Sequence, residues 1–142
     1  MIAYAYYGLG KTTLCNNLPD IFVDFDEEYA MHDFNQDLNR IKKTITNLSK
    51  HYIVLINGNL ATLDIKVDIA FMPENIQMVI DRLENRGVDK SFIKFMYDTF
   101  NENQHFIRQK CNNIITLTKN EYLSDCKDYI YNLANIPITE RK

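Results

Sequence analysis

The sequence predicts an α/β fold in three layers, with about five parallel strands covered by helices on both faces. Short apolar runs alternate with longer amphipathic stretches along the 142 residues, which is typical of strand–helix–strand units. The run at residues 52–56 is apolar throughout, as expected for a strand buried on both faces of a parallel sheet. A chain of this length fits one domain, residues 1–142, with a single hydrophobic core.

The composition is that of a globular chain and disfavours two classes of partner. Charged residues make up 25% and hydrophobic residues 46%, which excludes a disordered or low-complexity chain. With 16 basic and 19 acidic residues the net charge is -3, so nucleic-acid binding would need a local basic cleft and is not favoured. No apolar run approaches the roughly 20 residues that span a bilayer, so we expect no membrane partner.

The cysteines and the N-terminal residues indicate a cytoplasmic protein. Cys15, Cys111 and Cys126 are far apart and form no Cys-x-x-Cys pair, so free thiols in a reducing compartment are expected. The first residues carry neither the basic segment nor the long apolar core of a signal peptide. The histidines are isolated from one another and from the cysteines, which disfavours a metal site built on imidazole.

The first half of the chain begins with two expected strands. Residues 2–6 form the first strand, which runs into a glycine-containing loop and a helix that ends at residue 18, before Pro19. Residues 21–25 form the second strand, and an acidic cluster follows it. Residues 35–50 are expected to be helical because apolar side chains recur at every third or fourth position: Leu38, Ile41, Ile45 and Leu48.

The second half of the chain continues this alternation. Further strands are expected at residues 52–56, 67–71 and 113–117. Further helices are expected at residues 74–85, 91–108 and 122–133, and the tail from Pro137 is expected to be loose. Because ligands of parallel sheets bind beyond the carboxyl ends of the strands, the residues directly after each strand are the candidates for chemistry.

The loop after the first strand carries the most specific motif. Residues 5–12 match the phosphate-loop pattern G-x-x-x-x-G-K-[ST], except that Ala5 replaces the first glycine. Glycines let the backbone turn sharply so that successive N–H groups bind a phosphate, the lysine supplies a charge for the β- and γ-phosphates, and the threonine can hold Mg²⁺. The expected nucleotide-binding residues are Gly8, Leu9, Gly10, Lys11, Thr12 and Thr13. The alternative is a chance Gly-Leu-Gly-Lys turn that starts a helix.

At these residues the chain resembles the P-loop kinases that phosphorylate small acceptors, such as nucleotide kinases, shikimate kinase and gluconate kinase. It looks more closely like a group of small phage-encoded kinase-like proteins related to nucleotide kinases. The motifs are Tyr6-Tyr7-Gly8-Leu9-Gly10-Lys11-Thr12, Val23-Asp24-Phe25-Asp26, Arg82-Leu83-Glu84-Asn85-Arg86-Gly87 with Phe92-Ile93, and Glu121-Tyr122-Leu123-Ser124-Asp125. The resemblance implies a P-loop NTPase fold, ATP and Mg²⁺ as cofactors, and main-chain contact with adenine around Lys119.

The acidic cluster after the second strand predicts the metal and acceptor acids. Asp24 and Asp26 are two residues apart, so in a strand they share a face. The resemblance to shikimate kinase implies one acid on the metal side and one on the acceptor; we assign Asp24, with Thr12, to Mg²⁺ and Asp26 to the acceptor. Asn57, after the third strand, cannot supply the negative charge that many P-loop proteins place there. The alternative is a solvated acidic turn, and Glu27 and Glu28 are expected to be solvated surface charges.

Two arginines predict a short lid over the site. Arg82 and Arg86 are four residues apart on one expected helix, so they share a face and could neutralise the transferred phosphoryl group. The alternative is surface ion pairing with Asp81 or Glu84. Gly87 ends the helix, and the short connection to the next helix predicts closure by a helix tilt. Proteins of the kind that this chain resembles tend to carry a basic residue soon after the third strand, where an acceptor phosphate could be held. Residues 57–64 contain none, which weakens the expectation of a monophosphate acceptor.

Aromatic side chains are expected mainly in the core. Of Tyr6 and Tyr7, one should pack in the core and the other should line the mouth of the cleft. The phenylalanines and the methionine of the helix at residues 91–108 are expected to pack between helices: Phe92, Phe95, Met96, Phe100 and Phe106.

Together these residues predict a kinase that transfers a phosphoryl group from ATP to a small acceptor, most simply a nucleoside or nucleotide. The expected catalytic residues are Lys11, Asp24, Asp26, Arg82 and Arg86. One alternative is a kinase acting on a nucleic-acid end or a modified base. Another is a nucleotide-binding module without turnover, which Ala5 and Asn57 would favour.

Overall fold

The computed structural model describes the whole chain, residues 1–142, except for the side chain of Glu28. Within it, parallel strands form a single sheet in the order β2-β3-β1-β4-β5. The strands are β1 (Ile2–Ala5), β2 (Phe22–Phe25), β3 (Ile53–Ile56), β4 (Ile69–Pro73) and β5 (Ile114–Leu117). The α/β fold expected from the sequence is therefore confirmed, with each strand within two residues of its expected position.

Strand β1 lies at the centre of the sheet and pairs with a neighbour on each side. Ala3 is in register with Leu55 of β3 and with Ile69 of β4. Every residue of β1 and of β3 is buried. The apolar runs of the sequence form these two strands because helices cover both faces of the sheet and no face needs polar side chains.

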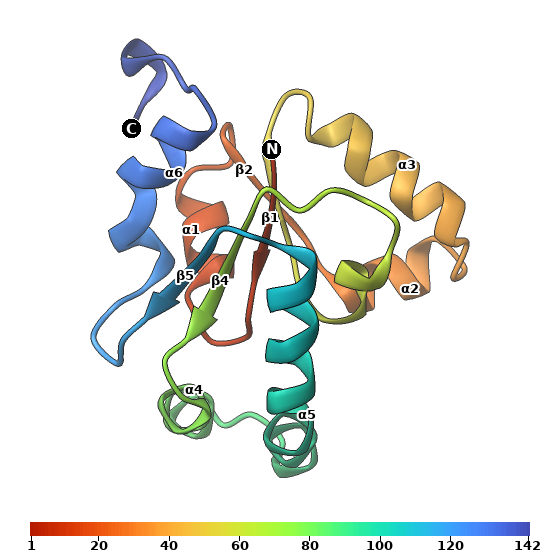
Figure 1. The fold of residues 1–142 in the computed structure, drawn as a ribbon, viewed down its shortest axis with the longest axis vertical. Coiled ribbons are helices and arrows are strands. Elements are labelled where there is room, and N and C mark those ends of the chain that lie inside the picture. Colours follow the sequence, from red (N-terminus) through yellow and green to blue (C-terminus); the bar gives the residue numbers. More distant parts are fainter.

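The helices cover the sheet on both sides (Figure 1). They are α1 (Lys11–Asn17), α2 (Glu27–Asp33), α3 (Leu38–Leu48), α4 (Ile76–Asn85), α5 (Lys90–Lys110) and α6 (Lys127–Leu133), with short 3₁₀ helices η1 (Gly58–Thr62), η2 (Leu123–Cys126) and η3 (Ile138–Glu140). Helices α1 and α6 lie on one side, and α3 and α5 on the other. Right-handed crossovers explain this division, because the connections from β1 to β2 and from β4 to β5 run in opposite directions along the sheet.

Side-chain caps start the longer helices. Asp37 accepts a hydrogen bond from Arg40 N at 3.1 Å and begins α3. Asn75 accepts one from Met78 N at 3.0 Å and begins α4. Each cap satisfies one of the N–H groups that a helix start leaves without an internal partner, so these polar residues set where the helices begin.

The structure differs from the sequence-based expectation in four segments. Helix α2 was not expected, and α3 starts at Leu38 rather than at residue 35 because Asn35 has a left-handed backbone, with φ of 51°. The helix expected at residues 122–133 is divided into η2 and α6. The tail is not loose, because Arg141 donates to Ile136 O at 2.9 Å and to Asn132 Oδ1 at 2.8 Å.

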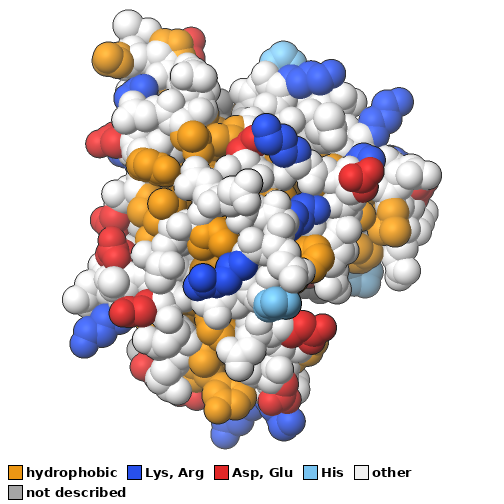
Figure 2. Space-filling view, in the orientation of Figure 1, with side chains coloured by type: hydrophobic (Ala, Val, Ile, Leu, Met, Phe, Trp, Pro, Cys, Tyr) orange, Lys and Arg blue, Asp and Glu red, His pale blue; other side chains and the backbone are white. Residues whose placement is uncertain are grey.

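The aromatic residues divide between core and surface. Tyr6 is 1% exposed, whereas Tyr7 is half-buried at the cleft, as expected. Phe95 and Phe106 were expected to pack between helices, but they are 55% and 37% exposed. Figure 2 shows hydrophobic side chains from the part that carries α6 and α1 down to the part that carries α4 and α5, with basic and acidic side chains scattered around them. No described helix is both long enough and apolar enough to cross a membrane.

Strand β3, buried between β2 and β1, predicts a large loss of stability when one of its core side chains is truncated. Leu55 is 0% exposed and pairs with β1 and β2. Leu55→Ala should lower the free energy of unfolding by about 2–5 kcal/mol, because rigid layers on both faces cannot close around the cavity. Thr46→Ala, at an exposed position of α3, is the control and should change it by less than about 0.5 kcal/mol. Urea unfolding measures both, and similar midpoints for the two variants would contradict this account of the core.

Candidate functional site

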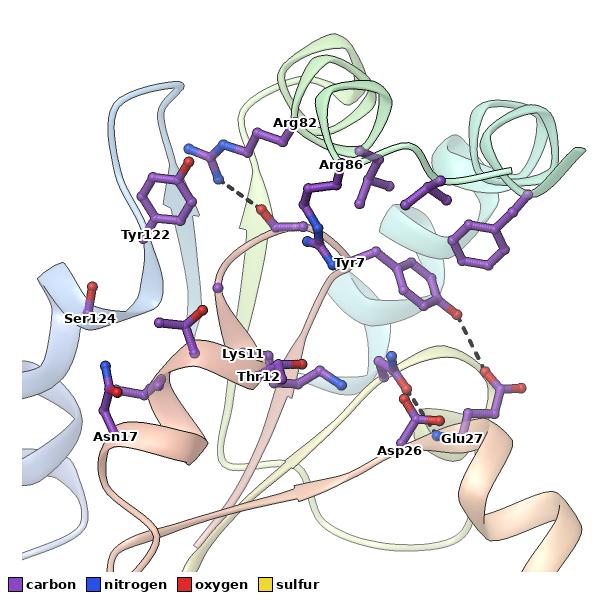
Figure 3. Close-up of a pocket in the computed structure, with 18 of the residues that line it drawn as sticks. Tyr7, Lys11, Thr12, Asn17, Asp26, Glu27, Arg82, Arg86, Tyr122 and Ser124 are labelled. Atoms are coloured by element: carbon purple, nitrogen blue, oxygen red, sulfur yellow. Dashed lines mark hydrogen bonds between the residues drawn. The ribbon is translucent and has the colours of Figure 1, made fainter. Parts of the chain in front are cut away.

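A cavity of about 1340 Å³ opens at the carboxyl edge of the sheet (Figure 3). The glycine loop (residues 6–10), the start of α1, the turn after β2 and the residue after β3 all contribute to it, as a parallel sheet predicts. In Figure 3 Asn17, Tyr122 and Ser124 line one end, which we call the η2 end. Asp26 and Glu27 line the opposite end, which we call the acidic end, and the glycine loop lies between the two.

The glycine loop has the backbone that its sequence predicts. Gly8 and Gly10 are left-handed, with φ of 75° and 89°. A Cβ atom on Gly8 would lie 2.9 Å from Val79 Cγ1, so this position needs glycine for space as well as for its backbone. Ala5, in contrast, is the last residue of β1 and has an extended backbone, so alanine at this position brings no strain.

Lys11 and Thr12 line the middle of the cavity, and both side chains contact Asp24. Lys11 Nζ lies 2.8 Å from Asp24 Oδ1, and its side chain is 9% exposed. Thr12 Oγ1 donates to Asp24 Oδ2 at 3.4 Å. The loop after β1 thus meets the end of β2, although β3 lies between these strands in the sheet. The expected juxtaposition of the glycine loop with the first acid after β2 is present.

The second acid, Asp26, lines the acidic end of the cavity. Its Oδ1 accepts a hydrogen bond from Tyr29 N at 3.3 Å, in the first turn of α2. The two acids therefore have different surroundings. Asp24 is paired with Lys11, and Asp26 lies at the entrance to α2 and faces the cavity.

Glu27 does not have the solvated position expected from the sequence. It is half-buried and lines the cavity. Its backbone N–H donates to Asn57 Oδ1 at 3.3 Å, and Tyr7 Oη donates to its Oε2 at 3.5 Å. Burial first, and then the nearby Glu27 carboxylate, raise the pKa of Tyr7 well above its ordinary value, so its hydroxyl stays a donor at neutral pH. The side chain of Glu28 lies outside the described part of the chain.

Asn57 has a structural task at the end of β3. It is 4% exposed, and its side-chain oxygen accepts the hydrogen bond that starts α2 at Glu27. Gly58, the next residue, has φ of 54°, and a Cβ atom there would overlap the Glu27 carboxylate. The Asn-Gly pair after β3 therefore determines where Glu27 lies.

Arg82 joins α4 to the glycine loop and to the loop after β5. Its Nη1 donates to Gly8 O at 3.0 Å, and its Nη2 donates to Lys119 O at 2.9 Å and to Glu121 O at 2.8 Å. Its guanidinium also lies over the Tyr122 ring, 3.9 Å from the centroid. The expected role of Arg82 on a transferred phosphoryl group stays a prediction, and these contacts give it a positioning role that the sequence did not indicate.

Arg86, one turn further along α4, is exposed and lines the cavity. Figure 3 shows it reaching from the end of α4 towards the glycine loop and Lys11. The alternative of surface pairing is not seen in the described residues, where neither arginine lies within 4.0 Å of a carboxylate and Asp81 bonds to Gln77 Nε2 at 2.8 Å. Val88 and Phe92, which continue the cavity wall, belong to the connection to α5 and to its first turn.

The loop after β5 contributes less directly to the cavity than expected. Lys119 is exposed, and its carbonyl accepts a hydrogen bond from Arg82.

Leu9, expected among the nucleotide-binding residues, has a fully buried side chain, and its carbonyl accepts from Leu123 N at 2.9 Å. Thr13 does line the cavity. At the η2 end it is joined by Tyr122 and Ser124, which belong to one of the motifs of the family resemblance but were given no role, and by Asn17 and Lys127, which sequence reasoning did not single out.

Possible metal ligands are limited to a few oxygens. The described residues contain no group of three or more His, Cys, Asp or Glu side chains arranged to hold a metal ion. Thr12 Oγ1 and Asp24 Oδ2 offer one hydroxyl and one carboxylate side by side. Mg²⁺ fits such a pair, because it commonly takes one or two protein ligands and completes its shell with phosphate oxygens and water.

Comparisons with known proteins inform the fold alone. No family model and no curated protein matches this chain. A solved structure described as an uncharacterized protein from Eubacterium ventriosum ATCC 27560 aligns with a TM-score of 0.52 at 14% identity. The alignment covers 96% of this chain and 98% of that chain, so the likeness extends over the whole domain.

Truncation of Arg82 and truncation of Arg86 are predicted to have different effects on the free energy of unfolding. Arg82→Ala should lower the free energy of unfolding by about 1–3 kcal/mol, because three main-chain carbonyls lose a charged donor. Arg86→Ala, at an exposed position, should change it by less than about 0.5 kcal/mol. Thermal and urea unfolding without ligand compare them, and equal losses would contradict the positioning role of Arg82.

Proposed function

We propose that this protein transfers the γ-phosphoryl group of ATP to a small acceptor with the help of Mg²⁺. One observation carries the proposal: Asp24 joins Lys11 at 2.8 Å and Thr12 at 3.4 Å, beside a glycine loop and midway along a cavity with space on both sides. The η2 end would receive the nucleoside part of ATP, and the acidic end would receive the acceptor. The reacting groups would then meet above Lys11.

On the nucleotide side, main-chain N–H groups of the glycine loop and Lys11 would bind the β- and γ-phosphates. The Lys11 ammonium has three donors, so its bond to Asp24 leaves two for phosphate oxygens. Thr12 and Asp24 would hold Mg²⁺, which when bound neutralises negative charge on the phosphate oxygens. At the η2 end, Tyr122 could stack on the adenine, held in place by Arg82.

On the acceptor side, Asp26 would orient the attacking hydroxyl and accept its proton. A bond forms between the hydroxyl oxygen and the γ-phosphorus, and the bond from that phosphorus to the bridging oxygen breaks, leaving ADP. Arg86 would bind the transferred group, since it is exposed above Lys11 and its guanidinium has several donors. The proton-accepting role is assigned to Asp26 because it lines the acidic end of the cavity, whereas Asp24 lies beside Thr12 on the metal side.

Two sequence features that favour a non-catalytic module have structural explanations. Ala5 belongs to the extended strand β1, where a methyl group is compatible with the backbone. Asn57 starts α2 and orders Glu27, so its amide serves the fold, and Asp24 can provide the acid that Asn57 lacks. A kinase of nucleic-acid ends is less well supported, because basic and acidic side chains are scattered over the face drawn in Figure 2 and form no continuous basic surface on that face of the described chain.

Lys11→Ala tests the nucleotide side. Removal of a buried cation that contacts the phosphates should weaken ATP·Mg²⁺ binding by about tenfold or more, while the loop backbone persists. Lys43→Ala, at an exposed position of α3, is the matched control and should bind as the wild type does. Calorimetric titration measures both affinities, and an unchanged value for Lys11→Ala would reject the proposed phosphate site.

Asp26→Asn tests the acceptor side. The amide keeps the shape but cannot take a proton, so phosphoryl transfer should fall by roughly 10²-fold or more while ATP affinity is retained. Asp33→Asn, at the exposed end of α2, is the control. A coupled assay of ADP release with an active acceptor measures the rates. Wild-type turnover by Asp26→Asn would show that another group accepts the proton.

A further inference from the structure

We propose that the acceptor is an uncharged nucleoside, and that Glu27 is the specificity residue that binds its sugar and excludes phosphorylated acceptors. This inference rests on the proposed phosphoryl transfer and narrows its substrate class. The sequence alone left nucleosides and nucleotides open.

The charges around the acidic end oppose an anionic acceptor. Asp26 and Glu27 both line it. Of the described lysines and arginines that line the cavity, Lys11 is paired with Asp24, Arg82 is bonded to main-chain carbonyls, and Lys127 lies beyond Ser124 at the η2 end. Arg86 faces the glycine loop, where the transferred group would lie. His32 is the further basic group on this side, and it is exposed on α2. A monophosphate bound at the acidic end would therefore lie beside two carboxylates, and each of the lysines and arginines just named serves another partner or another part of the cavity.

Glu27 is held in one position by three neighbours. Its backbone is bonded to Asn57, its carboxylate accepts from Tyr7, and it packs directly over Gly58. A carboxylate fixed in this way is suited to two adjacent hydroxyls, because its two oxygens can accept a hydrogen bond from each. The arrangement therefore favours a sugar or polyol next to Asp26, where a hydroxyl would be activated.

Apolar side chains form a wall beside these carboxylates. Tyr7 and Phe92 pack edge to face with ring centroids 5.2 Å apart, and both are half-buried in the cavity wall. Met31 and Val88 also line the cavity and are partly buried. Such a surface suits a flat ring that stacks on or inserts against aromatic groups. A hydroxylated sugar joined to a planar base matches both halves of this end of the cavity.

The experiment compares matched acceptors with the full chain, ATP and Mg²⁺. Uridine, cytidine, adenosine and guanosine, which carry the adjacent 2′- and 3′-hydroxyls, are each assayed beside their 5′-monophosphates and beside a short single-stranded oligonucleotide. At least one nucleoside should be phosphorylated with a kcat/KM about tenfold or more above that of its monophosphate, since like charges at close range oppose binding. A preference for a monophosphate or for the oligonucleotide would overturn the proposal.

Variants at Glu27 and Gly58 test whether the Glu27 side chain recognises the nucleoside, as distinct from a general loss of activity. Glu27→Gln should raise the KM for the nucleoside by about tenfold. It should also lower the ratio of kcat/KM for the nucleoside to kcat/KM for its monophosphate, with ATP affinity unchanged. Glu102→Gln, at an exposed position of α5, is the control and should keep the wild-type ratio. Gly58→Ala places a methyl group against the Glu27 carboxylate, so it should raise the same KM without altering ATP affinity. If Glu27→Gln leaves the preference unchanged, Glu27 is not the specificity residue.

Separate calorimetry with ATP·Mg²⁺ distinguishes the failure of this inference from that of the proposed function. If ATP binding depends on Lys11 but no nucleoside is phosphorylated, the acceptor assignment is wrong and the nucleotide site stands. If ATP does not bind, the proposed function fails and the acceptor assignment fails with it.

Discussion

The central position of β1 is the constraint on which the site depends. This strand is bonded to β3 on one side and to β4 on the other, and Tyr6 N continues the pairing to Phe71 O at 3.1 Å. The glycine loop must therefore leave the sheet where the carboxyl ends of its neighbours also lie. The residues that follow β2 and β3 come close to the loop for this reason, and the cavity lies between elements that have no proximity in the sequence.

The sequence predicts well those features that depend on local backbone and burial. Gly8, Gly10, Lys11 and the apolar strands could be placed because a left-handed turn and a buried strand restrict the residue types allowed. The meeting of Asp24 with Lys11 was also predictable, since the topology brings the carboxyl ends of parallel strands to one edge.

The remaining features depend on partners that a sequence does not display. Arg82 bonds to carbonyl groups, which every residue possesses, so no pattern of side chains could indicate that contact. Glu27 resembles any other acid in an acidic run until Asn57 and Gly58 are seen packed against it. The exposed positions of Phe95 and Phe106 were mispredicted because helical periodicity indicates which residues share a face, but not how much of a long helix the sheet covers.

The bonds of Arg82 also divide the lid region into a fixed part and a part that can move. Because α4 is tethered to the glycine loop one turn before its end, a tilt of the whole helix would break three hydrogen bonds to charged nitrogen at once. The second half of α5 is anchored as well, by the bond from Tyr4 Oη to Asn103 Oδ1 at 2.9 Å. The helices on both sides of this region are therefore anchored, so the freedom left for closure over the cavity lies in the short connection from Arg86 to Asp89 and in the exposed Arg86 side chain.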